Sequence, residues 1–139
     1  MAPLSPADVS EPTARPRSLH PWRDKFYVAF RGIVFGVRGQ TSFRVHFVFA
    51  LLVPILAAVL RCDAVEWCLL LGCIGLVLTA ELINNAIETL FRGLEGKAQD
   101  RVWPCLDMAA GAVVVASLTA MVTGLIIFAP KLAAWLGVR

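Results

Sequence analysis

An uncharged run of 22 residues, 108–129, limits the folds open to this chain more than any other part of its sequence. A helix needs about 20 consecutive apolar residues to cross the hydrocarbon core of a bilayer, so this run is long enough to be a span. The composition agrees, because 58% of the 139 residues are apolar and only 17% are charged, against about a quarter in soluble domains. The sequence predicts an all-α membrane protein with no room for a separate soluble catalytic domain.

Two more apolar segments precede this run. The first extends over 43–60, and the second begins at Trp67 but stays uncharged for only 14 residues, as far as Ala80. Because 14 residues are too few to cross a bilayer, the second helix must continue through Glu81 to about Glu88. We therefore predict three spans, over 43–60, 67–88 and 108–129.

The connections between these spans are polar. We expect a short loop over 61–66, a longer polar connection over 89–107, and an end to the third span at Pro130. Ten of the 13 Lys and Arg residues lie in the first 46 residues or in the second connection. Since cytoplasmic segments carry an excess of these cations, the N-terminus and the 89–107 connection are predicted to face the cytoplasm. Beside spans, such basic segments face anionic lipid, so no nucleic-acid partner is expected.

The chain before the first span divides into two parts. Residues 1–21 hold five prolines among polar side chains, a composition that cannot bury a core and that predicts a disordered tail. From Trp22 to Gly39, apolar residues recur at helical spacing and alternate with cations, which predicts an amphipathic helix. Such a helix either lies in the membrane interface or packs against other helices, and the spacing leaves both interpretations open. Residues 22–139 are thus expected to form one membrane-embedded domain.

Glu81, Asn84, Asn85 and Glu88 are the residues least expected in a membrane helix. Spacings of three, four and seven place Glu81, Asn84 and Glu88 on one stripe at the cytoplasmic end of the second span. Ionisable groups at membrane depth are costly and therefore indicate a functional site. Two carboxylates about 10 Å apart along a helix are too distant to share one proton, which predicts a general base and a separate cation ligand. The alternative is that Glu88 snorkels to the interface and the asparagines bond neighbouring helices.

Asp107 stands at the start of the third predicted span. As a single residue it is best interpreted as a helix cap, whose carboxylate accepts backbone N–H bonds. The predicted topology also brings it to the same cytoplasmic surface as Glu88, which makes it a second candidate for the site.

The run Glu81-Leu-Ile-Asn-Asn-Ala-Ile-Glu88, followed by Asp107 and Met-Ala-Ala-Gly-Ala-Val, resembles the bacterial membrane-embedded diacylglycerol kinase and undecaprenol kinase family. Upstream, Ser42-Phe-Arg-Val-His46 and Glu66-Trp67 are similar to the undecaprenol kinase branch, and the resemblance covers roughly residues 24–130. It implies a multi-pass lipid kinase of the bacterial inner membrane, active as a homotrimer. Such an enzyme transfers the γ-phosphate of ATP, with Mg²⁺, to the hydroxyl of diacylglycerol or undecaprenol.

The resemblance also assigns roles to single residues. Glu81 is implied to be the general base for the lipid hydroxyl, with Asn84 positioning the reacting groups. Glu88 is implied to hold magnesium and the nucleotide, and Asp107 and Arg31 to contact the nucleotide. These roles suit phosphoryl transfer, which needs positioning, a cation and an acceptor hydroxyl beside a base.

Three positions depart from the family pattern. Gln40 stands where the family usually has a second metal-binding Glu, and a neutral amide is a weaker magnesium ligand. Leu106 replaces a Lys that helps to hold ATP phosphates, and Arg92 replaces an Asp. Arg92 can pair with Glu88 or meet a phosphate, so compensation and loss of activity are both open. The alternative functions are a catalytically impaired relative that binds lipid or nucleotide, and a small structural or pore-forming membrane protein.

Overall fold

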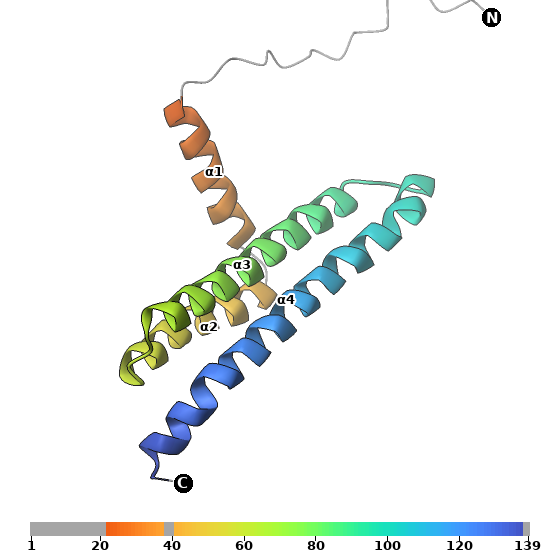
Figure 1. Cartoon of the computed structure of the whole chain (residues 1–139). Helices are drawn as coiled ribbons and strands as arrows, with labels where there is room; N and C mark the ends of the chain where they lie inside the picture. The colour runs from red at the N-terminus through yellow and green to blue at the C-terminus, as the bar shows by residue number, and fades with distance from the viewer. Residues whose placement is uncertain (1–21, 38–40, 138–139) are drawn as a thin grey trace, which may run out of the picture.

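Four helices make up the computed structural model (Figure 1). They are α1 (Trp22–Val37), α2 (Thr41–Val59), α3 (Ala64–Arg92) and α4 (Lys97–Trp135). The structure describes residues 22–37 and 41–137, so the predictions for residues 1–21 and for Gln40 lie outside the described residues. Within these limits the all-α class and the helix that begins at Trp22 are confirmed.

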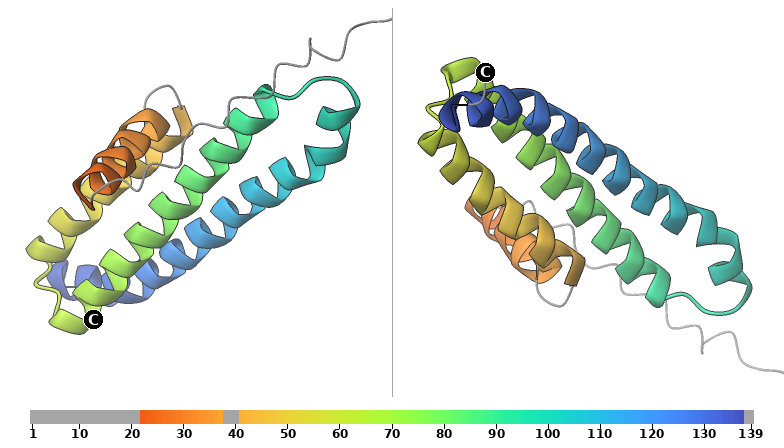
Figure 2. Two further views of the ribbon diagram at one scale, coloured as in Figure 1. Left: turned by 90° about the horizontal axis from the view of Figure 1, so that it is seen from above. Right: turned by 90° about the horizontal axis from the view of Figure 1, so that it is seen from below.

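The longest two helices, α3 and α4, form an antiparallel hairpin (Figure 1). Seen from above and below, α3 lies between α4 on one side and α1 and α2 on the other (Figure 2). Helices α2 and α4 converge at one end of the hairpin, where Ala57, Leu70, Ile127 and Phe128 form a buried cluster. Helix α3 is therefore the element on which the other three are arranged.

A capping box starts α3 earlier than the apolar pattern predicts. Asp63 Oδ1 accepts hydrogen bonds from the backbone N–H groups of Val65 at 2.8 Å and Glu66 at 2.9 Å. In return, Glu66 Oε2 accepts from the Asp63 N–H at 2.8 Å. These bonds satisfy donors that the first helical turn leaves unpaired. Helix α3 then continues to Arg92, which confirms that it extends beyond the uncharged 14-residue run.

The predicted polar connection over 89–107 is wrong in its extent. Helix α3 ends at Arg92 and α4 begins at Lys97, so the loop covers only 93–96. Gly96 turns the chain there with φ of +57°, a conformation that glycine adopts without steric cost. Hydropathy marks where a helix enters a membrane, whereas a polar turn can extend the same helix beyond it. The third predicted span, 108–129, therefore lies inside a longer helix, α4.

Asp107 and Pro130 both lie inside α4, contrary to their predicted places at its ends. Asp107 follows Lys97, the first helical residue, by ten positions. The N–H groups there are already bonded to carbonyls of the preceding turn, so Asp107 is not a helix cap. Pro130 does not end the helix, which continues to Trp135. Proline removes one backbone bond, a loss that membrane helices tolerate where neighbouring groups compensate.

Helices α3 and α4 are both long and apolar enough to cross a membrane. The apolar part of α2, Phe43–Val59, is shorter, so the count of three spans stays a prediction. Most large apolar side chains of the described chain are exposed, for example those of Phe26, Phe30 and Ile126. Such extensive apolar surface is incompatible with a soluble monomer and suits contact with lipid or with further helices.

Candidate functional site

One face of α3 carries the polar residues that the sequence singles out. Glu81, Asn84 and Asn85 are buried, and Glu81 is only 1% exposed. Leu70 and Val77 of the same helix are buried as well. Spacings of seven, four and three residues align Leu70, Val77, Glu81 and Asn84 along α3. The polar residues therefore continue the buried apolar stripe of this helix.

Hydrogen bonds link the polar residues of α3 toward its C-terminal end. Asn84 Nδ2 donates to Glu88 Oε1 at 3.2 Å, and Arg92 Nη2 donates to Glu88 Oε2 at 3.0 Å. The Arg92 side chain is 70% exposed and that of Glu88 is 28% exposed. The two bonds thus connect the buried Asn84 through Glu88 to the exposed Arg92, the last residue of α3. Because α3 stays helical as far as Arg92, this residue pairs with Glu88, one of the two contacts that the sequence left open for it.

Three buried oxygen atoms on this face have no hydrogen-bond partner within the described residues: Glu81 Oε1, Asn84 Oδ1 and Asn85 Oδ1. A buried polar atom left unpaired costs roughly 1–3 kcal/mol, and in native proteins it marks a catalytic group or the place of a water or ion. All three atoms are acceptors. The face therefore lacks a donor or a cation, such as a hydroxyl group or a metal ion.

Asn85 joins α3 to α1. Its Nδ2 donates to the backbone oxygen of Gly36 at 3.3 Å, which confirms the interpretation of this asparagine as a bond to a neighbouring helix. A Cβ on Gly36 would collide with the end of the Leu82 side chain, so a larger residue there would require Leu82 to shift. Sequence reasoning missed Gly36, although a glycine in a helix of bulky apolar residues is a usable signal. Arg31, on the same helix, is exposed.

Asp107 lies at the same end of the hairpin as Glu88. The rings of Phe91 in α3 and Trp103 in α4 meet edge to face, with centroids 5.2 Å apart. Asp107 follows Trp103 by four residues, and Ile87 precedes Phe91 by four. Because the two helices are antiparallel, Asp107 lies about level with Ile87 and Glu88. The Asp107 side chain is exposed. The structure thus brings Asp107 to the end of the hairpin where the sequence predicted it, although not as a cap.

The oxygen atoms at this site fit a magnesium ion that binds together with a nucleotide. Within the described ranges, no group of three His, Cys, Asp or Glu side chains is arranged to hold a metal. Magnesium, however, is usually bound by one or two carboxylates together with substrate phosphates. Glu88 offers a carboxylate, and Asn84 Oδ1 is a nearby oxygen on the same face. The other predicted ligand, Gln40, lies outside the described residues.

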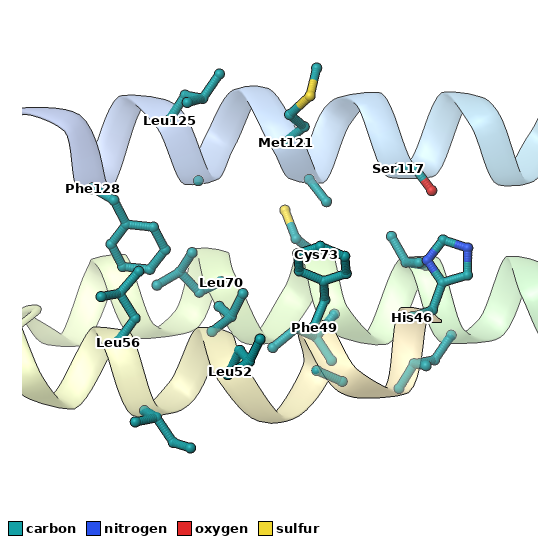
Figure 3. Close-up of a pocket in the computed structure, with 18 of the residues that line it drawn as sticks. His46, Phe49, Leu52, Leu56, Leu70, Cys73, Ser117, Met121, Leu125 and Phe128 are labelled. Carbon is teal, nitrogen blue, oxygen red and sulfur yellow. The ribbon is translucent and has the colours of Figure 1, made fainter. Parts of the chain in front are cut away.

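An apolar groove of about 900 Å³ runs between α2, α3 and α4 (Figure 3). His46 and Ser117 lie at one end of it and Phe128 lies at the other. Val77 also lines the groove, one helical turn before Glu81. The groove therefore leads along the buried stripe of α3 towards the Glu81 carboxylate.

Comparison with known proteins assigns the chain to a family. The family model described as prokaryotic diacylglycerol kinase matches residues 27–128, which include Glu81, Asn84, Glu88 and Asp107. An undecaprenol kinase from Bacillus subtilis is 34% identical over 107 residues, which are 77% of this chain and 87% of that protein.

Two further relatives are named diacylglycerol kinase. The protein from Synechocystis is 26% identical over 142 residues, covering 94% of this chain and 81% of the relative. The protein from Shigella flexneri is 30% identical over 84 residues, covering 60% and 69%. No solved structure gives a significant match. Because the family model covers most of the sequence and includes the polar stripe of α3, the chain belongs to the prokaryotic diacylglycerol kinase family, a family of lipid kinases.

Proposed function

We propose that this protein transfers the γ-phosphate of ATP to the hydroxyl of a membrane lipid, diacylglycerol or undecaprenol. The observation that carries the proposal is Glu81, a buried carboxylate one turn beyond an apolar groove, with an oxygen that has no partner among the described residues. The acceptors are those in the names of the relatives. An apolar groove suits the hydrocarbon part of such a lipid, and a buried acceptor oxygen suits its hydroxyl.

In this proposal Glu81 acts as the general base. The lipid oxygen forms a bond to the γ-phosphorus, the bond from that phosphorus to the bridging oxygen of ADP breaks, and the hydroxyl proton passes to the Glu81 carboxylate. Glu81 is 1% exposed, so water has little access to the base. Exclusion of water favours transfer to the lipid over hydrolysis of ATP.

The nucleotide is proposed to bind at the outer end of the stripe. Glu88 and Asn84 would hold the magnesium ion, which when bound neutralises charge on the phosphates. Asp107 lies level with Glu88 and is exposed, as a nucleotide contact must be, and Arg31 is proposed as a further contact. The excess of cations at this end of the molecule supports placing it at the cytoplasmic face of the inner membrane, where ATP is present. Assembly into a homotrimer is also proposed from the family resemblance, and the exposed apolar helices leave surface for contacts between copies.

A second candidate is a catalytically impaired relative that binds lipid or nucleotide. The observation that favours it is the ion pair between Arg92 and Glu88 at 3.0 Å, since it engages an oxygen of the proposed magnesium ligand. The two candidates differ in one measurable property, the formation of a phosphorylated lipid.

The test is transfer of labelled γ-phosphate from MgATP to diacylglycerol and to undecaprenol in mixed micelles. Wild-type protein is expected to form labelled lipid, and E81Q to form at least about a hundredfold less. The exposed Glu95 allows a matched control, E95Q, which should retain activity. Folded wild-type protein that labels neither lipid would favour the impaired relative, and an active E81Q would remove Glu81 from the mechanism.

A further inference from the structure

Ser117 has a buried hydroxyl without a hydrogen-bond partner in the described part of the chain. Two other hydroxyls on α4 behave differently, because Thr119 Oγ1 donates to the Val115 carbonyl and Thr123 Oγ1 to the Thr119 carbonyl, both at 2.9 Å. A bond of this kind, to the carbonyl four residues earlier, is the usual way to satisfy a hydroxyl in an apolar helix. Ser117 does not form it, so its hydrogen is available to a ligand.

His46 lines the same groove as this hydroxyl. Both residues are at the same end of the groove, His46 on α2 and Ser117 on α4 (Figure 3). Among the residues that line the groove, these two are the ones with a nitrogen or oxygen atom in the side chain. A neutral imidazole has one N–H donor, and a hydroxyl has one O–H donor. The groove therefore has two side chains with hydrogen-bond donors at one end, the polar end of an otherwise apolar lining.

Along α3, the polar end of the groove is the end nearer to Glu81. Ser117 follows Trp103 by 14 residues, and Val77 precedes Phe91 by 14. Because Phe91 and Trp103 are in contact and the helices are antiparallel, Ser117 lies about level with Val77 along the helix axes. Glu81 follows Val77 by four residues, a rise of about 6 Å along the helix. A lipid whose hydroxyl lies at Glu81 would thus have the next few atoms of its backbone beside Ser117 and His46.

We propose that Ser117 and His46 form a specificity-determining subsite that donates hydrogen bonds to an ester carbonyl of the acceptor lipid. The inference rests on the proposed function and selects between its two acceptors. In diacylglycerol, ester carbonyls lie a few bonds from the hydroxyl. A polyprenyl alcohol has no polar atom beyond its hydroxyl and would leave the buried Ser117 hydroxyl unpaired. Because unpaired buried groups reject a ligand that lacks their partner, the subsite favours acylglycerols.

The experiment compares acceptors that differ only in the carbonyl. Phosphate transfer from MgATP is measured with diacylglycerol, with the dialkyl ether of the same chain length, and with undecaprenol. For wild-type protein, we expect kcat/KM to be about tenfold higher for the diacyl lipid than for the ether, the effect of one or two hydrogen bonds. We also expect diacylglycerol to be used better than undecaprenol.

Variants test whether these two side chains cause the preference. S117A and H46L should lower kcat/KM for the diacyl lipid to the level of the ether and leave transfer to the ether unchanged. Removing an unpartnered hydroxyl breaks no bond, so S117A should remain folded. H46Q keeps a donor and should restore part of the preference. T119V is the matched control, because the Thr119 hydroxyl already bonds within its helix, and it should behave as wild type.

Several results would overturn the subsite while leaving the kinase proposal intact. These are equal use of ester and ether by wild-type protein, an equal loss for both acceptors in S117A, or a preference for undecaprenol that S117A does not change. Failure to phosphorylate any lipid would overturn the proposed function instead. In that case, binding of a fluorescent diacylglycerol to E81Q is measured with and without S117A. Weaker binding of the ester but not of the ether would support the subsite, and equal binding would overturn it.

Discussion

Glu88 lies between two donors of its own helix, Asn84 and Arg92. The bond with Asn84 connects it to the buried layer, and the ion pair with Arg92 is largely exposed. An exposed pair at this spacing contributes only about 0.3–0.5 kcal/mol. In the proposed mechanism, the pair is thus weak enough for a magnesium ion to replace the Arg92 contact, but it would compete with the ion for the same carboxylate.

We therefore expect R92Q to lower the Mg²⁺ concentration that gives half-maximal activity by about twofold. The measurement is a magnesium titration of phosphate transfer at a fixed ATP concentration. R101Q, which changes an exposed arginine of α4, is the control and should leave the titration unchanged. An unchanged or higher magnesium requirement in R92Q would show that Arg92 does not compete for Glu88.

Some residues of the site could be predicted from the sequence and others could not. The helical period fixes which side chains share a face, so the alignment of Glu81, Asn84 and Glu88 follows from their spacing alone. Ser117 gives no such signal, because most serines in apolar helices bond to their own backbone. Only the packed structure shows that this hydroxyl is buried without that bond.

At the level of helices, Asp63 sets where α3 begins. Its carboxylate accepts two backbone bonds in the first turn. Replacing such a cap with alanine typically costs about 1 kcal/mol. We expect D63A to lower the free energy of unfolding in detergent by about this amount and to retain phosphate transfer, because Asp63 lies far from Glu81 along the helix. Unchanged stability in D63A would contradict the role of the capping box.

The ends of α3 and α4 opposite the proposed site are joined by an ion pair. Lys131 Nζ lies 2.9 Å from Glu66 Oε2, outside the predicted spans. The hydrogen bond with Lys131, and then that with the Asp63 N–H, hold the pKa of Glu66 below its ordinary value. The same bond with Glu66 raises the pKa of Lys131.

The directions of these two shifts define a pH window. A carboxyl group whose pKa is lowered by folding stabilises the folded state at pH values above its unfolded pKa, and this stabilisation is lost as the pH falls. An amine with a raised folded pKa stabilises below its unfolded pKa, and this is lost as the pH rises. The pair thus contributes fully between about pH 5 and pH 10. Melting temperatures of wild type and K131M should differ most inside this window and converge outside it. A difference independent of pH would refute the contribution.

Helix existence was easier to predict than helix ends. The apolar runs indicated the cores of α2, α3 and α4, because a membrane requires apolar residues and helical backbone bonding. The start of α4 at Lys97 was missed because residues 97–107 are polar, and nothing in hydropathy distinguishes an exposed helical extension from a loop. The prediction that Pro130 ends the helix was wrong for a related reason, since proline ends helices in water more strictly than in a membrane.

At the scale of the whole molecule, the chain leaves most of its apolar surface exposed. A homotrimer would cover part of this surface and lipid the rest. Helix α1 packs against α3 of its own copy at Gly36, and we propose that its exposed Arg31 contributes to the site that contains Glu81 of the neighbouring copy.

Mixing two inactive variants tests this arrangement. E81Q and R31A, combined before assembly, are expected to recover about a quarter of wild-type activity if the trimer is closed and symmetric and each site uses both residues from adjacent copies. The measurement is phosphate transfer by the mixture against each variant assembled separately. A mixture no more active than its components would show that no site is shared in this way.

The central claim is that a lipid hydroxyl, rather than water, accepts the phosphate beside Glu81. The most direct measurement is ³¹P NMR of wild-type protein with MgATP and diacylglycerol in micelles. The account predicts a lipid phosphomonoester signal that grows in step with ADP and is absent with E81Q. Release of inorganic phosphate without a lipid phosphomonoester, or no consumption of ATP by the folded protein, would contradict it.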